Sequence, residues 1–360
     1  MKISIGTNIK DGPWGGGNLF AINLKNYLIE NNHQVINNLK DDNIDLILLT
    51  EPRITSESSA FTDFDVFKYL TKINNQTLVV HRINECDERK NTKNVNKTLL
   101  EANKVADATI FVSTWLMKLF LSIGINDKNA SVIYAGADEN IFNSKGRVEY
   151  SNKNKLKIIT HHWGNNWNKG FDIYSKLDDL IGTSEWSEKI EFSYIGNLPK
   201  NFNFKNSNYI PPLDGLELAS ELKKHHLYIT ASLNEPSGNH HIEAAQCGLP
   251  ILYLNSGGIP EYCDGYGVSF TDDFEEKLSL IISEYETHKI KMKDYPFNSE
   301  KMCEDFLDLF NDLVNNKSSN QFIKLNWVSY LFLMKNKLLK FVRRDIFINL
   351  KNIIKKRVRK

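Results

Sequence analysis

The stretch EPSGNHHIEAAQCGLP, Glu235 to Pro250, decides how the chain folds. An apolar run, LYITAS (Leu227 to Ser232), precedes it, and another, Ile251 to Leu254, follows it. Inside the stretch, a short turn of small residues opens a segment that we expect to be a helix ending near Gly248. The order is therefore strand, turn, helix and strand, which is the repeating unit of a parallel sheet covered by helices.

Two carboxylates stand eight positions apart in this stretch, Glu235 before the turn and Glu243 inside the expected helix. Gly238 lets the backbone of the turn approach a ligand closely, and the first N–H groups of a helix attract an anion. Glu243 is placed to accept hydrogen bonds from the vicinal hydroxyls of a sugar. The alternative is that both glutamates are solvated and flank an ordinary helix cap, and their spacing favours neither interpretation.

The same alternation of short apolar runs and helical patterns extends outward through most of the chain, and the polar stretch 144–155 interrupts it once. We expect strands at residues 2–6, 45–49, 77–80, 108–112, 131–133, 156–160, 190–195, 227–229 and 251–254. Expected helices include residues 97–105, 114–122 and 171–180, and one that buries Phe20, Leu24, Leu28 and Ile29. The predicted fold class is α/β, with two Rossmann-like, doubly wound domains, residues 1–150 and 151–318, facing across a ligand-binding cleft.

Length and composition agree with two globular domains. The chain has 360 residues, of which 41% are hydrophobic and 25% charged, an ordinary globular composition. Its four cysteines include no C-x-x-C pair, which argues against a disulfide framework or a zinc site. We find no secretory leader and no apolar run of the roughly 20 residues that span a bilayer. We therefore expect a cytoplasmic protein with a soluble body.

Positive charge is concentrated at the C-terminus. Eleven lysines and arginines and one acid lie between Lys335 and Lys360, a local charge of +10 in a chain whose net charge is +1. Apolar residues recur there at helical spacing: Leu339, Val342, Ile346, Leu350 and Ile353. We predict that residues 319–360 form a basic amphipathic helical tail that lies, through 321–360, on an anionic membrane surface. Packing on the body or on a partner protein is the alternative, and nucleic acid is not an expected partner.

A glycine loop follows the first expected strand, where Gly15, Gly16 and Gly17 lead into a helix. Successive glycines allow a phosphate to reach backbone amides, although a flexible connector between strand and helix is the alternative. The spacing is not G-x-G-x-x-G, so it supports a dinucleotide site only weakly.

Two further segments carry side chains that can meet an anion or a sugar. His81 closes the strand expected at residues 77–80, at the end of a parallel strand where ligands bind. Lys169 precedes a helix in HHWGNNWNKGFDIY, residues 161–174. A buried structural histidine and an exposed lysine beside a turn are the respective alternatives.

Together these segments resemble the retaining glycosyltransferases of family 4, which have the GT-B fold. Glu235 to Glu243 is similar to the family's E-x7-E motif, and SGGIPEYC, residues 256–263, resembles the glycine loop that follows it. The matched segments occur in the family's order, from about residue 3 to about residue 314.

The resemblance implies a role for each matched residue. Glu235 would contact the transferred sugar, and Glu243 would hold the nucleotide ribose. Lys169 would stabilise the leaving diphosphate, and His81 would lie near the sugar and the acceptor. The donor would also meet Gly15, Gly16, Gly17, Gly238, Asn239, His240, Gly257 and Gly258, and the acceptor would meet Arg82 and Asn84.

Two places depart from the family's pattern. The three residues from Asn239 to His241 stand where the family has apolar side chains, and Gly164 stands where it has an arginine. Three residues are candidates to replace that arginine: His161, His162 and Arg82. The alternative is that phosphate stabilisation rests more on Lys169 and the glycine loop.

The resemblance therefore implies a retaining hexosyltransferase that moves a sugar from a nucleoside-diphosphate sugar to a glycan or lipid-linked acceptor, in cell-envelope or surface polysaccharide synthesis. No metal or other cofactor is expected, since the D-x-D sequence Asp63-Phe64-Asp65 is remote from the glycine loops and we interpret it as coincidental. The basic tail predicts a peripheral position on the inner face of a membrane. Two alternatives stay open: a GT-B-like nucleotide-sugar epimerase, and a non-catalytic scaffold that binds carbohydrate or membrane.

Overall fold

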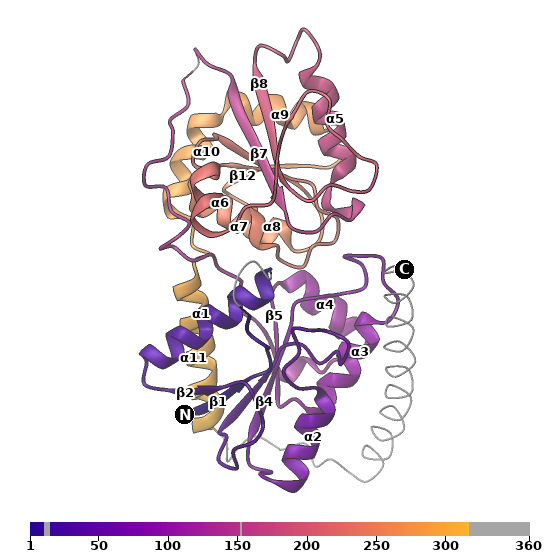
Figure 1. Ribbon diagram of the computed structural model, residues 1–360, viewed down its shortest axis with the longest axis vertical. Helices are drawn as coiled ribbons and strands as arrows, with labels where there is room; N and C mark the ends of the chain where they lie inside the picture. Colours follow the sequence, from indigo (N-terminus) through magenta and orange to yellow (C-terminus); the bar gives the residue numbers. More distant parts are fainter. Residues whose placement is uncertain (11–14, 152, 317–360) are drawn as a thin grey trace, which may run out of the picture.

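The computed structural model describes residues 1–10, 15–151 and 153–316, which form two lobes, each built on one parallel sheet (Figure 1). The predicted α/β class with two doubly wound sheets is confirmed. The predicted tail, residues 319–360, lies outside the described residues. Within the described residues, no helix combines the length and the apolar character that crossing a membrane requires.

The first sheet has six parallel strands in the order β2-β1-β3-β4-β5-β6. Its strand β3 reads LILL and is buried at every position, because a parallel strand covered on both faces needs a continuous apolar run. The strands are β1 (Lys2–Ile5), β2 (Gln34–Ile36), β3 (Leu46–Leu49), β4 (Leu78–Ile83), β5 (Ala108–Phe111) and β6 (Ala130–Val132).

Helices cover both faces of this first sheet (Figure 1). One face carries α1 (Gly16–Glu30), and the other carries α2 (Asp63–Lys72), α3 (Val95–Ala102) and α4 (Thr114–Ser122), with short 3₁₀ turns η1 (Asn103–Val105) and η2 (Asp127–Asn129). Phe20, Leu24 and Leu28 of α1 are buried as predicted. The prediction for Ile29 is wrong: its side chain is 49% exposed, because one step along a helix turns a side chain by about 100°.

The D-x-D sequence begins a helix. Thr62 is the N-cap of α2, and its backbone N–H donates to Oδ2 of Asp65 at 2.9 Å while its side chain accepts from the N–H of Asp65. This capping box satisfies two of the N–H groups that a helix start leaves unpaired. A structural reason therefore exists for Asp65 at this position.

The second sheet is also parallel, in the order β12-β11-β10-β7-β8-β9. Its strands are β7 (Leu156–His162), β8 (Ile190–Gly196), β9 (Asn208–Ile210), β10 (Leu227–Thr230), β11 (Ile251–Leu254) and β12 (Gly267–Phe270). Three strands of the two sheets were not predicted: β2, β9 and β12.

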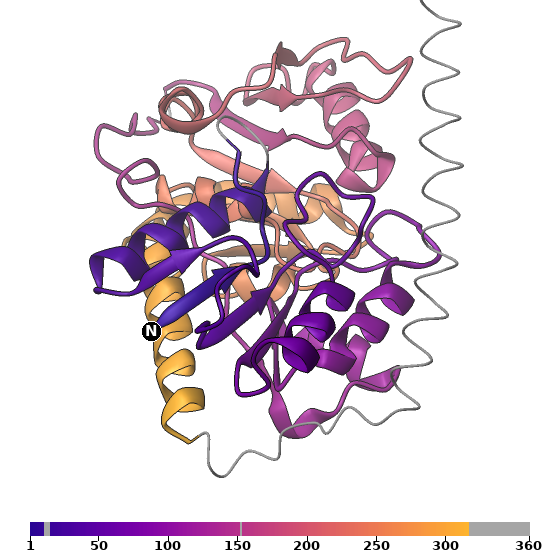
Figure 2. The same ribbon diagram turned by 60° about the horizontal axis from the view of Figure 1, so that its bottom comes forward.

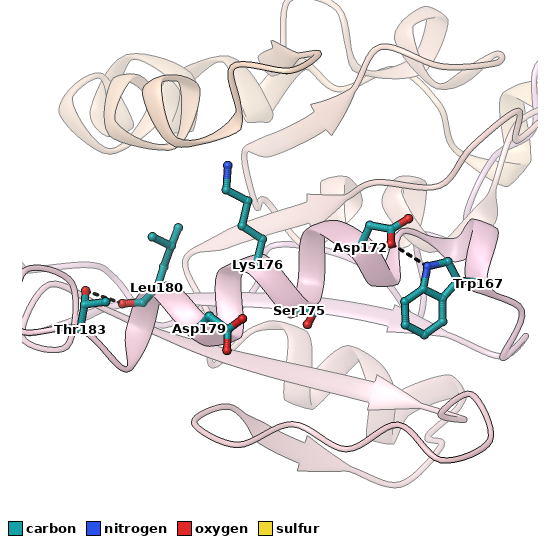
Figure 3. A pocket seen from close by; sticks show the side chains of 7 residues that line it. All are labelled: Trp167, Asp172, Ser175, Lys176, Asp179, Leu180 and Thr183. Carbon is teal, nitrogen blue, oxygen red and sulfur yellow. Dashed lines mark hydrogen bonds between the residues drawn. The ribbon is translucent and has the colours of Figure 1, made fainter.

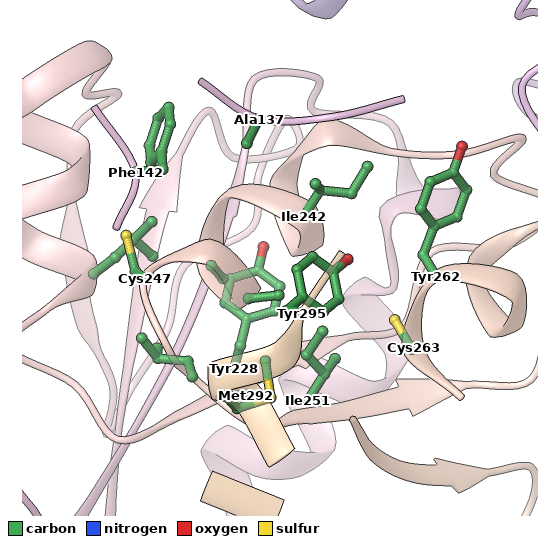
Figure 4. Close-up of a cluster of buried hydrophobic side chains, with 14 of the residues drawn as sticks. Ala137, Phe142, Tyr228, Ile242, Cys247, Ile251, Tyr262, Cys263, Met292 and Tyr295 are labelled. Carbon is green, nitrogen blue, oxygen red and sulfur yellow. The ribbon is translucent and has the colours of Figure 1, made fainter. Parts of the chain in front are cut away.

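Two apolar layers sandwich the second sheet. One packs under α5 (Phe171–Ile181) and α9 (Phe274–Ser283), and the other under α6 (Gly215–Leu222), α7 (Asn239–Gln246) and α8 (Ile259–Cys263). Figure 4 shows part of the second layer, in which Tyr228 and Ile251 from the sheet lie beside Ile242 from α7. The remaining elements are η3 (Trp167–Lys169), α10 (Tyr285–Lys291), η4 (Met292–Asp294) and α11 (Ser299–Asn315).

The chain passes between the lobes twice, and the two crossings are paired. Ala137 on the first crossing and Asn298 on the second form an isolated parallel β-bridge, and the N–H of Ser299 donates to the carbonyl of Ala137 at 2.8 Å. Beyond this point α11 returns to the first lobe and lies beside α1 (Figures 1 and 2). There Phe306 and Phe310 of α11 join the apolar core of the first sheet. The predicted domain limits of 150 and 318 stay a prediction.

Candidate active site

Glu235 lies in the loop after β10 and is 2% exposed. Both of its carboxylate oxygens are paired: Oε2 lies 2.5 Å from Nζ of Lys169, and Oε1 lies 2.7 Å from Nε of Arg89. Lys169 comes from the turn η3 before α5 in the second lobe, whereas Arg89 comes from the loop between β4 and α3 in the first lobe. The predicted sugar ligand and the predicted diphosphate ligand are therefore in direct contact, and a residue of the other lobe completes the group.

The charges of this group fix its protonation. Burial would raise the pKa of Glu235, but the positive charges of Arg89 and Lys169 outweigh it and hold that pKa at about 2. Burial lowers the pKa of Lys169, and the carboxylate of Glu235 opposes that fall. Burial alone would also lower the pKa of Arg89, but Glu235 and Glu85 raise it overall. Glu235 is therefore an anion at neutral pH and serves as a hydrogen-bond acceptor, not as an acid.

Two further charged side chains extend the group into the first lobe. Oε2 of Glu85 lies 3.2 Å from Nη1 of Arg89 and 2.9 Å from Nζ of Lys90. We call the five residues Glu235, Lys169, Arg89, Glu85 and Lys90 the Glu235 cluster. Arg89 and Lys90 were not predicted, because they lie in a loop with no glycine or strand signal and meet Glu235 only through the tertiary fold.

Glu243, the second predicted carboxylate, lies on α7 and is 9% exposed. Its Oε2 is 2.9 Å from Nε2 of His161, which stands near the end of β7. The Tyr228 hydroxyl accepts from the backbone N–H of His161 at 3.1 Å, and this contact holds the end of β7 in place. The carboxylate of Glu243 is thus oriented beside the turn that begins with Glu235.

The three residues that are candidates to replace the missing arginine each contact another side chain. His161 pairs with Glu243, His162 lies 2.7 Å from the hydroxyl of Tyr174, and the guanidinium of Arg82 lies 3.8 Å from the centre of the Phe20 ring. Arg89 is the second cation beside Glu235.

Three histidines of this region, His162, His240 and His241, are buried. His240 lies 2.9 Å from the hydroxyl oxygen of Thr230, and burial lowers the pKa values of His162 and His240 well below the ordinary range. Burial also lowers the pKa of His241 to about 3. The departure from apolar residues at 239–241 therefore adds hydrogen-bonding groups near the donor turn without adding charge.

Glycines from both lobes approach the turn between Glu235 and α7. A Cβ added to Gly16 would lie 2.9 Å from Cγ of Asn239, so the first glycine loop meets the second lobe here. Gly257 has φ +66°, and a Cβ there would lie 2.5 Å from the carbonyl oxygen of Glu235. The N–H of Gly258 donates to that same oxygen at 2.8 Å. Gly238, the N-cap of α7, completes the turn.

The two other glycines of the first loop are exposed at the start of α1, where Gly15 is the N-cap and Gly17 lies in the first turn. Their backbone is therefore accessible to solvent. The structure thus places the glycine loops, Lys169, Glu235 and Glu243 around one turn, and their roles toward a donor stay predictions.

His81 does not end its strand. β4 continues to Ile83, so His81 lies inside the strand, and its side chain is fully buried with Nδ1 2.9 Å from Oδ1 of Asn103. Burial lowers the pKa of His81 to about 4. The strand end was predicted too early because Arg82 interrupts the apolar pattern. Asn84, directly after β4, is partly exposed, and the acceptor-side roles of Arg82 and Asn84 stay predictions.

Glu261 of the second lobe forms hydrogen bonds with a helix of the first lobe. Its carboxylate accepts from the backbone N–H groups of Thr114 and Trp115, both at 2.7 Å, and from the hydroxyl of Tyr134 at 3.1 Å. The first two N–H groups belong to the start of α4, which a negative charge stabilises. Residue 261 of the second lobe thus caps a helix of the first.

A surface groove lies away from these residues. It follows the outer side of α5 (Figure 3) and is lined by Trp167, Asp172, Ser175, Lys176, Asp179, Leu180 and Thr183. It contains no predicted site residue, so we do not assign the donor to it. Among residues 1–10, 15–151 and 153–316, no group of three or more histidines, cysteines or carboxylates is arranged to hold a metal ion. Metal independence stays a prediction.

Comparison with known proteins supports this fold. Against solved structures, the chain is similar to a glycosyltransferase from Rickettsia africae, with a TM-score of 0.64, 13% identity, and coverage of 88% of this chain and 99% of that one. HepE of Anabaena in complex with UDP gives a TM-score of 0.63 and 14% identity over 87% of this chain and 100% of that one. AviGT4, a glycosyltransferase involved in avilamycin A biosynthesis, gives a TM-score of 0.61 and 13% identity, with coverage of 88% of this chain and 98% of that one. The fold is GT-B.

Sequence comparison adds a partial match. No protein-family model matches the chain. One curated relative, the phosphatidylinositol N-acetylglucosaminyltransferase gpi3 subunit of Schizosaccharomyces pombe, is 28% identical over 143 residues, or 36% of this chain. The match spans 31% of the relative's own length.

Proposed function

We propose that the protein is a retaining glycosyltransferase of the family 4 type. It transfers a sugar from a nucleoside-diphosphate sugar to a glycan or lipid-linked acceptor in cell-envelope or surface polysaccharide synthesis. The observation that carries this proposal is the contact of Glu235 with Lys169 in the second lobe and with Arg89 in the first. An anionic sugar ligand and a cation for the diphosphate stand side by side where the lobes meet.

The donor would lie against the turn before α7. The first N–H groups of that helix have no acceptor within the helix, and together with Lys169 they suit a diphosphate. Glu243 is placed one helical turn further on to accept hydrogen bonds from the ribose hydroxyls. Glu235, ionised at neutral pH, would accept hydrogen bonds from the hydroxyls of the transferred sugar.

The reaction would proceed on one face of the sugar. The bond between C1 and the diphosphate oxygen breaks, and its electron pair stays on the diphosphate. The acceptor hydroxyl oxygen bonds to C1 on the same face, and its proton passes to a diphosphate oxygen. The protein contributes positioning and charge stabilisation, which agrees with a site in which both oxygens of the Glu235 carboxylate are paired with cations.

Uridine diphosphate sugars are the donors to test first. HepE of Anabaena has been solved with UDP and with UDP-glucose, and the pneumococcal O-GlcNAc transferase GtfA with UDP and GlcNAc. The curated relative is named for N-acetylglucosamine transfer to phosphatidylinositol. UDP-N-acetylglucosamine and UDP-glucose therefore head the donor panel. A lipid-linked acceptor agrees with the predicted basic tail at 321–360 and with a peripheral place on a membrane.

The deciding experiment is a thermal-shift panel of UDP, GDP, ADP and CMP on the purified full chain, followed by donor turnover with Lys169→Ala. We expect UDP to raise the melting temperature selectively, and Lys169→Ala to lose turnover while remaining folded. Lys176→Ala, which removes an exposed lysine from α5, is the matched control. Absence of stabilisation by any nucleotide would contradict the proposal. Rapid epimer formation without an acceptor would point to an epimerase instead.

A further inference from the structure

Arg89 contacts the turn that carries Lys169 through its backbone, in addition to the ion pair that its side chain forms with Glu235. The side-chain amide of Asn168 donates to the carbonyl of Arg89 at 3.3 Å, and the carbonyl of Asn168 accepts from the N–H of Leu233 at 2.7 Å. The loop after β4 is therefore docked directly on the turn before α5. Arg89 and Lys169 reach the same carboxylate of Glu235 from opposite lobes.

The charges of the Glu235 cluster do not balance. Lys169, Arg89 and Lys90 are positive, whereas Glu235 and Glu85 are negative, so the cluster carries one net positive charge, and its third cation, Lys90, is 46% exposed. A site with a net positive charge favours the binding of an anion. A diphosphate bound beside Lys169 supplies that anion.

The guanidinium of Arg89 also has N–H donors that form no hydrogen bond within the described residues. Its Nε faces Glu235 and its Nη1 faces Glu85. Among the described residues no hydrogen bond is formed by Nη2. An arginine can bind two anionic groups at once because its donors form a planar fork.

We propose that Arg89, supplied by the first lobe, is the second cation that binds the donor diphosphate, so that leaving-group stabilisation is complete only when the lobes are closed. This inference rests on the proposed function. As the bond from C1 to the diphosphate breaks and the electron pair moves to the diphosphate, Lys169 and Arg89 stabilise the charge together.

The arrangement has a consequence for side reactions. Opening the lobes withdraws Arg89 and leaves Lys169 as the one cation of the Glu235 cluster on the donor side. Water that enters the open site then meets a donor whose leaving group is poorly stabilised. Closure that both excludes water and completes a catalytic site protects a reactive donor from hydrolysis.

Position 164 offers a direct test. A Cβ added to Gly164 would lie 3.6 Å from Cε of Lys169 and 3.6 Å from Nδ2 of Asn166, which is ordinary van der Waals contact. A side chain at position 164 therefore begins beside Lys169, within the second lobe. Gly164→Arg in an Arg89→Ala background restores a diphosphate cation but does not restore the Arg89 contact to Glu235.

The experiment measures UDP affinity by calorimetry and kcat with UDP-N-acetylglucosamine or UDP-glucose, for Arg89→Ala, Arg89→Lys and the double variant. We expect Arg89→Ala to lower kcat about 100-fold and to weaken UDP binding. Arg89→Lys should lose less, and the double variant should recover at least tenfold of the lost kcat. Lys176→Ala is the control for removal of a cation, and circular dichroism checks folding.

Wild-type kcat and UDP affinity in Arg89→Ala would overturn the inference while leaving the proposed function intact. Failure of Gly164→Arg to recover any kcat in a folded double variant would also overturn it. That result is expected if Arg89 is purely structural, because a cation at position 164 cannot replace its contact with Glu235. If Arg89→Ala does not fold, Arg89→Lys with and without Gly164→Arg gives the same comparison. A wild-type protein that binds no nucleotide would overturn both the inference and the proposed function.

Discussion

Nε2 of His161 lies 2.9 Å from Oε2 of Glu243, although 82 positions separate the two residues in the sequence. The contact joins the end of β7 to the middle of α7. It leaves Glu243 with one oxygen directed by the protein and one for a ligand. An oxygen held in a fixed position in this way is suited to accept a hydrogen bond from a ribose hydroxyl.

Glu243→Gln should weaken UDP binding by roughly tenfold or more. A hydrogen bond to a charged acceptor contributes about 1.5–3 kcal/mol, and each 1.4 kcal/mol changes a dissociation constant tenfold. Calorimetry with UDP on the purified chain measures the effect. Glu188→Gln, which changes an exposed glutamate, is the control, and an unaltered affinity in Glu243→Gln would argue against a ribose-binding role.

Glu235 should make stability depend on pH in a defined window. Its folded-state pKa is about 2, below the usual 4.5, so its contribution is complete above about pH 4.5 and is lost as the pH falls toward 2. At 1.36 kcal/mol per pKa unit, the contribution at neutral pH is on the order of 3 kcal/mol. Urea unfolding of the wild type and Glu235→Gln at pH 7, 5 and 3 should show the difference in the free energy of unfolding shrinking as acid is added. A constant difference over that range would contradict the ion pairs.

Glu261→Ala should destabilise the first lobe although residue 261 belongs to the second. The change removes two hydrogen bonds to the start of α4 and one to Tyr134. Loss of a helix cap costs roughly 0.5–2 kcal/mol, which a urea titration detects. Glu217→Ala removes an exposed acid from the first turn of α6 and should change the free energy of unfolding by less than about 0.5 kcal/mol. Equal effects of the two changes would refute the bridging role.

Gly257→Ala should reduce activity as well as stability. The residue has φ +66°, and the new Cβ would lie 2.5 Å from the carbonyl oxygen of Glu235, so the turn that carries Glu235 must move. Gly265 has φ +84° and nothing within 4 Å of an added Cβ, so Gly265→Ala tests backbone strain without the clash. We expect each change to cost about 1–3 kcal/mol of stability and Gly257→Ala alone to lower donor turnover. Equal turnover in the two variants would show that the clash is relieved elsewhere.

The interior strands could be predicted from the sequence, but most of the edge strands could not. β2, β9 and β12 all stand at the edge of a sheet, and two of them have no buried residue. A strand that pairs on one side and faces solvent needs no continuous apolar run, so the pattern on which strand prediction depends is missing. The buried strands β3 and β10 have that pattern in full.

The candidate site divides in the same way. Glu235, Glu243, Lys169 and the glycines could be predicted because each sits beside a strand end or helix start that local sequence defines. Arg89 could not, since nothing around it indicates that a loop of the first lobe docks 146 positions away on residue 235. The spacing of residues along the chain predicts the structure within one lobe, whereas the ion pair of Arg89 and Glu235 joins the two lobes.

The paired crossings at Ala137 and Asn298 determine how the halves of the protein can be separated, both in motion and in the laboratory. The two connections run side by side and are hydrogen-bonded to each other. We therefore expect them to act as one hinge, about which the lobes rotate more readily than they separate. Because α11 then returns to bury Phe306 and Phe310, a fragment cut at residue 150 would leave an apolar seam of the first sheet uncovered. A split protein should therefore keep residues 299–315 with the first half, supplied as a separate peptide if necessary.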